Sequence, residues 1–267
     1  MKKQTRLKAS LFTFLGFVFV LLVWYLASFL LKRNQNDALP YPHDTFIKTF
    51  ELLFLSQSET TWLGMAFTLY RILIGFVLSF LLGCLLGTIA SLYKSFSNFL
   101  SISINIKRAI PTAAVVIVLL GIFLGPKTRW FIDYVPCILT FIVAFPIIYD
   151  SFKNGLDNED KDIIDALRLE GNLNSPRILF GIRYKDAWPY IGLGIAQSFG
   201  LSFKVSIMSE ILIANSSSKM GLGSLIINEK QNGTIENVLS YALIALLIMA
   251  LIDIPFIILK RRNEKEG

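Results

Sequence analysis

Residues 65–92 read MAFTLYRILIGFVLSFLLGCLLGTIASL, an apolar run in which Arg71 is the only charged residue. A helix needs about 20 consecutive apolar residues to cross a bilayer, so this run predicts a membrane-spanning helix. Gly75, Gly83 and Gly87 carry no side chain beyond hydrogen, which allows a second helix to approach closely. Arg71 lies near one end of the run, from where its long side chain is expected to snorkel toward the membrane surface.

The rest of the chain has the same character. Of its 267 residues, 54% are hydrophobic and 17% are charged, and the mean hydropathy is +0.59. Soluble domains carry roughly 25% charged residues, and disordered chains carry more charge still. Further spans are predicted at residues 11–31, at 109–124 extended back through 99–106, and at 130–148, 188–213 and 238–259. The expected fold class is therefore all-α, a polytopic membrane protein with six transmembrane helices.

Histidine and cysteine are scarce in this chain. His43 is the single histidine, and Cys84 and Cys137 both lie within apolar runs. A zinc or haem site, or Ser–His catalysis, cannot be assembled from one histidine beside a turn. Two cysteines in apolar runs predict small core residues and no disulfide framework. We expect no catalytic residues, no metal site and no cofactor.

Basic residues gather at the ends of the predicted spans. The net charge is +7, with four Lys or Arg residues before the first span and the sequence Lys260-Arg261-Arg262 after the last. The connection 149–187 is also rich in Lys and Arg, whereas the loops 32–64, 125–129 and 214–237 taken together carry fewer per residue. The positive-inside bias then predicts a multi-pass membrane protein with both termini in the cytoplasm. We therefore expect the positive charge to serve placement in the lipid bilayer, and we expect no nucleic-acid partner.

The outer connection 32–64 contains Leu39-Pro40-Tyr41-Pro42, which must be extended or turning. Asp44 is placed to cap an amphipathic helix over residues 45–55.

The cytoplasmic connection 149–187 predicts two short helices outside the bilayer. Residues 157–170 read DNEDKDIIDALRLE, with apolar residues at helical spacing and acids in the first turn. Gly171 follows where a helix can end, and Ser175-Pro176 can cap and open a second helix over 177–184. The segment could be a solvated loop of no special role. An apolar helix face outside the bundle favours the other interpretation, a docking surface.

Several segments of the chain resemble the signatures of a known family. Asp165-Ala166-Leu167, three residues and Gly171 resemble the EAA-x-x-x-G signature of ABC-transporter permease subunits. Residues 68–76 (TLYRILIGF) resemble the S-L-x-R-x-x-x-G-F start of the transport core, and residues 108–111 (RAIP) resemble R-x-I-P of the third span. Glu210-Ile211-Leu212 followed by Gly221-Leu222-Gly223 resembles E-x-L…G-L-G of the fifth span and its exit loop. These segments resemble the nitrate, sulfonate, taurine and thiamine-precursor branch.

The chain departs from the family signature at four places, one of which is an extra residue after the glycine. Asp165 stands where the signature has a glutamate, and Leu167 stands where it has the second alanine. Tyr184-Lys185 stands where many members have Leu-Pro.

The resemblance implies a type I permease whose EAA-like segment is a coupling helix that docks on a cytoplasmic ATPase. The residues carried over to this role are Asp165, Ala166, Leu167 and Gly171. The implied partners are an ABC ATPase dimer, an extracytoplasmic substrate-binding protein and a second permease copy, identical or related. The chain has no G-x-x-x-x-G-K-[ST] sequence, so ATP hydrolysis is assigned to the separate ATPase and not to this chain.

The same resemblance implies a division of the chain into three parts. Residues 1–64 are the cytoplasmic tail, first span and outer segment, residues 65–260 the transport core with the EAA-like segment 149–187, and residues 261–267 a basic tail.

The charged residues within the predicted spans include Arg108, Lys204 and Glu210. Intramembrane charges are rare and often mark a pathway, so all three are candidates to line one. Each could equally belong to a structural ion pair between helices. Lys204 and Glu210 are six residues apart on one helix and are not expected to pair with each other.

Three functions can be compared. An ABC importer permease for a small solute, anionic or resembling a thiamine precursor, accounts for both the spans and the helix–glycine–helix segment. A stand-alone secondary transporter or channel explains the spans but not that segment, and no inverted repeat is visible. A membrane-embedded enzyme would need a convergent catalytic set that the sequence lacks.

Overall fold

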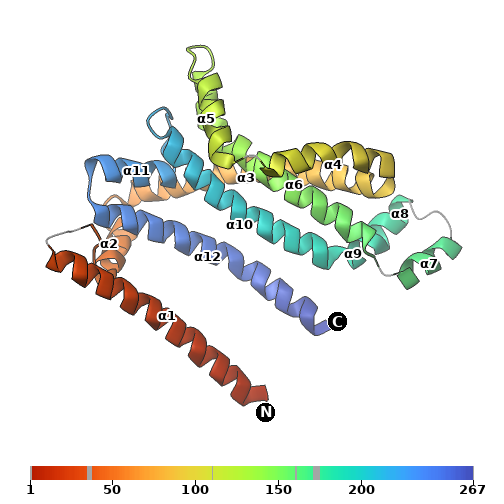
Figure 1. The fold of residues 1–267 in the computed structure, drawn as a ribbon, viewed down its shortest axis with the longest axis horizontal. Coiled ribbons are helices and arrows are strands. Elements are labelled where there is room, and N and C mark those ends of the chain that lie inside the picture. Colours follow the sequence, from red (N-terminus) through yellow and green to blue (C-terminus); the bar gives the residue numbers. More distant parts are fainter. Residues whose placement is uncertain (1, 35–37, 110, 160, 171–174, 267) are drawn as a thin grey trace. The chain divides into compact units, whose positions relative to one another are not determined.

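The computed structural model describes residues 2–34, 38–109, 111–159, 161–170 and 175–266, and in these ranges every regular element is a helix (Figure 1). The side chains of residues 2–10, 103, 105–109, 161, 163, 168, 170, 253 and 255–266 lie outside this description. The elements are α1 (Lys2–Arg33), α2 (Pro42–Phe54), α3 (Ser58–Leu92), α4 (Lys94–Ala109), α5 (Thr112–Phe123), η1 (Arg129–Tyr134), α6 (Val135–Asp157), α7 (Lys161–Glu170), α8 (Pro176–Ile178), η2 (Leu179–Arg183), α9 (Tyr184–Asp186), α10 (Trp188–Ile213), α11 (Leu222–Asn232) and α12 (Ile235–Glu266).

Within the described residues, five helical segments are long and apolar enough to cross a membrane. They are Leu11–Arg33, Ser58–Leu92, Arg129–Asp157, Trp188–Ile213 and Ile235–Ile252. These segments coincide with five of the six predicted spans, and the all-helical fold class is confirmed.

The third predicted span differs from expectation. Instead of one helix over 99–124, the chain forms α4 and α5, and Pro111 stands between them in an extended conformation with φ −61° and ψ 126°. Proline lacks the N–H that a continuous helix requires. The 12 residues of α5 reach about 18 Å, which is short of the ~30 Å hydrocarbon layer. On α4, Ile104 packs against Ala90 and Tyr149.

The helices divide into two compact units, Met1–Trp62 with Leu225–Ala245 and Leu63–Ser224 with Leu246–Gly267. In the first unit, Pro40 accepts hydrogen bonds from Trp24 Nε1 (3.1 Å) and from Ser28 Oγ (2.9 Å), which holds the Leu-Pro-Tyr-Pro turn against α1. The predicted amphipathic helix is confirmed as α2. Its N-cap is Tyr41 and not Asp44, because Pro42 occupies the first helical turn and Asp44 falls inside it.

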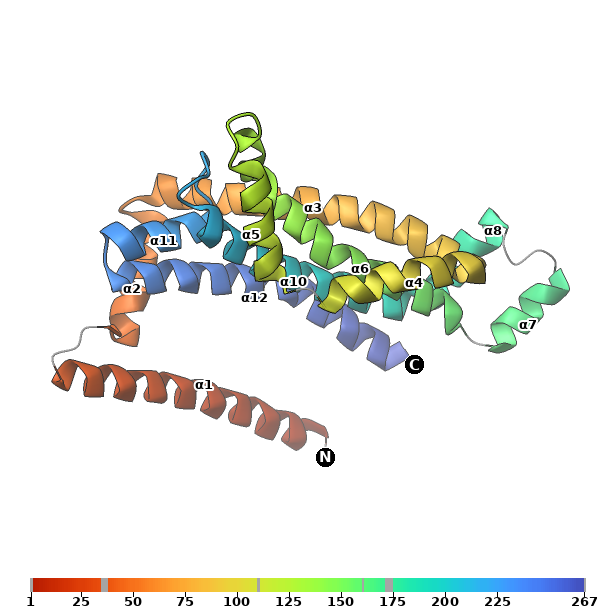
Figure 2. The ribbon, with the colours of Figure 1, turned by 45° about the horizontal axis from the view of Figure 1, so that its top comes forward.

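The second unit is built on α3, α6 and α10, which lie side by side in Figures 1 and 2. A Cβ atom at Gly75, Gly83 or Gly87 would overlap successive residues of α6, from Cys137 and Thr140 through Ile148 to Tyr149. The order of these contacts shows that α3 and α6 run in the same direction. The prediction that the glycines of α3 admit a close helix is therefore confirmed, and the helix is α6.

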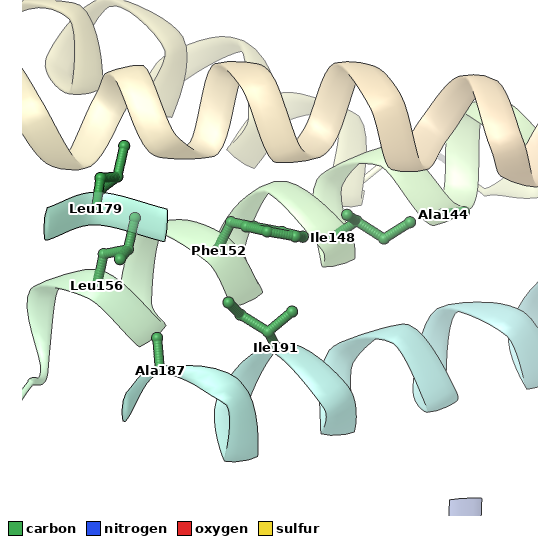
Figure 3. Packing of buried hydrophobic residues seen from close by; sticks show 7 residues of the cluster. All are labelled: Ala144, Ile148, Phe152, Leu156, Leu179, Ala187 and Ile191. Carbon is green, nitrogen blue, oxygen red and sulfur yellow. The ribbon is translucent and has the colours of Figure 1, made fainter. Parts of the chain in front are cut away.

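Helix α10 runs antiparallel to α6 and packs along it. Gly155 of α6 faces Ala187 and Ile191, whereas Gly194 of α10 faces Ser151. A core of seven buried residues fills one end of this unit: Ala144, Ile148, Phe152, Leu156, Leu179, Ala187 and Ile191 (Figure 3). Van der Waals contacts among these side chains hold α6, η2 and the start of α10 together. This core positions the short helices that lead into α10.

Candidate functional site: a buried ion pair, an exposed helix face and a cytoplasmic-type loop

A buried ion pair joins α3 to α10 at one end of the second unit. Arg71 Nη1 donates to Glu210 Oε1 at 2.8 Å, and the two side chains are 3% and 0% exposed. The other carboxylate oxygen, Oε2, accepts from Thr68 Oγ1 (2.8 Å) and from the backbone N–H of Gly223 (3.0 Å). The buried carboxylate thus has hydrogen bonds on both oxygens, as a buried charge requires.

The second guanidinium nitrogen of Arg71 extends these contacts to the α10–α11 loop. Nη2 donates to Ser217 Oγ at 3.2 Å and to the Lys219 carbonyl at 3.0 Å. Ser217 Oγ in turn donates to Asp133 Oδ1 at 2.6 Å, and Arg71 and Asp133 approach to 3.8 Å. We call Thr68, Arg71, Asp133, Glu210 and Ser217 the Arg71 network.

The Arg71 network brings together three segments that the sequence analysis singled out separately. Thr68 and Arg71 come from the S-L-x-R-like segment, Glu210 from the E-x-L-like segment, and Gly223 from the G-L-G-like loop. A Cβ atom at Gly221 would overlap the Glu210 carboxylate. The glycines of that loop are therefore explained by the close approach of its backbone to a buried charge.

The prediction that Arg71 snorkels to the membrane surface is wrong. Its side chain is buried and ion-paired with Glu210, and its second guanidinium nitrogen donates to Ser217 and to the Lys219 carbonyl. Lys204 and Glu210 do not pair, as predicted, since Glu210 is held by Arg71. Sequence reasoning missed Asp133 and Ser217, which no motif marked.

Lys204 lies on a different face of α10 from Glu210. Its side chain is exposed, and it belongs to a stripe at helical spacing that includes Leu193, Gln197 and Leu201. A cation in the middle of a span is costly when it faces lipid. Gln197 stands two helical turns before Lys204 on the same stripe, a spacing that could have identified it from the sequence. For Arg108, the structure describes the backbone within α4 and not the side chain.

The EAA-like segment forms α7, as predicted, and α7 ends at Glu170. Asp165 and Ala166 are exposed, and Leu167 is buried at 5% exposure. Leu169, on the same short helix, is 91% exposed. Gly171 lies outside the described residues. Ser175 caps the next helix by accepting from the N–H of Ile178 (3.4 Å), and Pro176 stands at its start, which confirms the predicted second helix.

The described residues contain no group of three or more His, Cys, Asp or Glu residues that could hold a metal ion. The arrangement offers a buried ion pair, an exposed polar face on a span and an exposed short helix.

Most of the chain matches a known protein family. The profile of the family described as binding-protein-dependent transport system inner membrane component matches residues 79–266. The chain belongs to this family. It is an ABC importer permease, and its apolar helices make it a multi-pass integral membrane protein. A comparison with curated protein sequences finds no match.

Two solved structures resemble the permease. Both are inward-facing conformations of the MetNI methionine ABC transporter. A chain of the selenomethionine-soaked crystal form has 18% sequence identity and a TM-score of 0.56, covering 79% of this permease and 98% of that chain. A chain of the native crystal form has 19% identity and a TM-score of 0.54, covering 76% and 93%. At these identities the likeness shows the fold alone, which is that of a type I importer permease.

Proposed function

We propose that this permease couples ATP hydrolysis by a separate cytoplasmic ABC ATPase dimer to import of a small solute, with α7 as the coupling helix. The observation that carries the proposal is the exposed surface of α7, a ten-residue helix held between two spans. Asp165, Ala166 and the 91% exposed Leu169 present a small, partly apolar face on a segment outside the spans. Such a face fits a groove on a partner protein. Gly171 would then set the turn that follows the docking helix.

The same proposal fixes the orientation. An ATPase is cytoplasmic, so α7 and both termini face the cytoplasm and the Arg71 network faces the outside, in the bacterial cytoplasmic membrane. This orientation agrees with the concentration of Lys and Arg in the connection 149–187.

An extracytoplasmic binding protein would deliver the solute at the end of the permease that carries the Arg71 network. That end has an open, polar hollow, lined by Arg129, Trp130, Asp133, Tyr134 and residues 215–219.

The solute pathway is assigned to the exposed stripe of α10. Gln197 and Lys204 are polar groups on a span, and a second permease copy facing this stripe would shield them from lipid. A cation at this position suits an anionic solute, including one of the sulfonate or nitrate type, and a thiamine precursor stays the alternative. Glu210 is better suited to a structural role, because Arg71 and Gly223 already occupy its oxygens.

The test is co-purification of the tagged permease from its native host, with identification of bound proteins by mass. The wild type should carry a P-loop ATPase. The Leu169→Asp variant should lose it while inserting at wild-type level, and Leu55→Asp, at an exposed leucine between α2 and α3 and outside the spans, should keep the ATPase. Retention of the ATPase by Leu169→Asp would mean that α7 is not the docking helix.

A further inference from the structure

The connection that carries α7 runs from α6 to α10. A second buried ion pair joins the residues on either side of α7, Glu159 and Arg183. Arg183 Nε donates to Glu159 Oε1 at 3.0 Å and to Oε2 at 2.8 Å, across 24 residues of chain. Arg183 Nη2 also donates to the Leu156 carbonyl at 3.4 Å. The side chains of Arg183 and Glu159 are 9% and 2% exposed. Glu159 lies just before α7 and is thus bound to Arg183, the last residue of the π-helical turn η2. The turn η2 also packs against the end of α6.

Burial and the ion pair act on Glu159 in opposite directions. Burial raises the pKa of Glu159, and the hydrogen bonds and charge of Arg183 lower it. Loss of Arg183 would leave a carboxyl group in a site that disfavours its charge, so the two residues depend on each other.

The next residue, Tyr184, connects the same turn to α3. Its hydroxyl lies 2.6 Å from Thr88 Oγ1, and Thr88 Oγ1 donates to the Cys84 carbonyl at 2.7 Å. Because the hydrogen of Thr88 is already committed to Cys84, Tyr184 is the donor. Burial raises the pKa of Tyr184 to about 12, so that it keeps this proton at any working pH. The Tyr184 ring packs edge-on against Phe152 of the core shown in Figure 3.

Consecutive helical residues point about 100° apart. Arg183 and Tyr184 therefore reach two different spans from one turn, Arg183 the end of α6 and Tyr184 the end of α3. A second contact supports the same joint, since Ser91 of α3 donates to Asp157 of α6 at 2.7 Å. The residues that flank the exposed helix α7 are thus held to the ends of α6 and α3 by buried hydrogen bonds and an ion pair.

We propose that the Glu159–Arg183 ion pair and the Tyr184–Thr88 hydrogen bond transmit displacement of α7 to α6 and α3. This inference rests on the proposed function. Glu159, Arg183, Tyr184 and Thr88 are positioning residues: they touch neither solute nor nucleotide and act through the spans they connect. Removing either contact should uncouple ATP hydrolysis from solute delivery without releasing the ATPase.

The test uses the full permease complex, co-purified with its ATPase and reconstituted with solute-loaded or empty binding protein. Thr88→Val removes the hydroxyl at nearly constant volume, and Thr88→Ser retains it. Tyr184→Phe removes the other partner, and Tyr190→Phe, at an exposed tyrosine of α10, is the matched control. We expect Thr88→Val and Tyr184→Phe to bind the ATPase and keep basal hydrolysis, but to lose at least threefold of the stimulation by loaded binding protein. Thr88→Ser and Tyr190→Phe should behave as the wild type.

The ion pair is tested by Glu159→Gln and by the exchanged double variant Glu159→Arg with Arg183→Glu. Glu159→Gln should lose stimulation in the same way, and the exchanged pair should recover at least half of it. Three results would overturn the inference: wild-type stimulation in Thr88→Val, Tyr184→Phe and Glu159→Gln; loss of the ATPase from these variants, which would make the residues part of the docking surface; or equal defects in Thr88→Ser and Thr88→Val. Failure of the proposed function is a different result, because the wild-type complex itself would then show no stimulation.

Discussion

At the scale of single residues, the buried charges of this permease are held by partners from distant parts of the sequence. Glu210 and Arg71 are 139 positions apart, and Glu159 and Arg183 are 24 apart. Removing one member of a buried pair leaves the other without compensation, and this typically costs about 3–5 kcal/mol. Removing both members costs less, because no unpaired charge remains in the interior.

The first prediction concerns the Arg71–Glu210 pair. Arg71→Ala and Glu210→Ala should each lower the thermal stability of the purified permease, and the double variant should be less destabilised than the sum of the two. The measurement is a double-mutant cycle on thermal unfolding in detergent. Lys204→Ala, at an exposed position of the same helix, serves as the control. Additive effects would show that the two side chains do not interact.

The second prediction concerns Gly221. A Cβ atom there overlaps the Glu210 carboxylate, so Gly221→Ala should displace the carboxylate from Arg71 and destabilise the permease by about 1–3 kcal/mol. Gly121 in α5 has nothing within 4 Å of its built Cβ, and Gly121→Ala should be neutral or slightly stabilising. Thermal unfolding of the two variants makes the comparison. If both variants were equally stable, the glycines of the G-L-G-like loop would not be explained by the close approach of its backbone to Glu210.

At the scale of helices, hydrophobic runs predicted five of the six spans correctly, and the cap at Ser175-Pro176 predicted the start of a short helix. The run at 188–213 became α10, and Ser175-Pro176 opened α8 as expected. The break between α4 and α5 was missed because apolar residues continue on both sides of Pro111, and run length alone does not register a lost N–H.

Ion-pair partners in the site could not be predicted from spacing. Arg71 and Glu210 were each visible as charges in spans, but their pairing depends on α3 and α10 meeting at one end of the bundle. The exposure of Lys204 was likewise not readable from its sequence neighbours, because it depends on which face of α10 packs against α6.

The third prediction concerns the exposed stripe of α10. Lys204→Gln should reduce uptake of an anionic solute several-fold while the assembled complex is obtained at wild-type yield, because the side chain is exposed and its charge would line the proposed pathway. The measurement is uptake of labelled nitrate, a sulfonate and a thiamine precursor into proteoliposomes, with the exposed Lys94→Gln as control. A loss of assembled complex would instead make Lys204 a structural partner.

At the scale of the whole molecule, the account depends on which end of the bundle faces the cytoplasm. The fourth prediction uses a variant without native cysteines, in which Cys84 and Cys137 are replaced by serine. A cysteine at position 50 should react with an impermeant reagent in intact cells, and a cysteine at position 160 only after permeabilisation. Labelling of position 160 from outside would reverse the orientation and remove α7 from the reach of a cytoplasmic ATPase.

The central claim is that α7 docks on the ATPase, and site-specific cross-linking tests it most directly. In the same cysteine-free background, Ala166→Cys places a thiol on the exposed side of α7. With a short bifunctional reagent, the co-purified complex should give a cross-link between position 166 and the ATPase subunit, identified by mass, and Phe50→Cys should give none. An ATPase that co-purifies in full but forms no cross-link to position 166, or forms one to position 50, would contradict the assignment of α7 as the coupling helix.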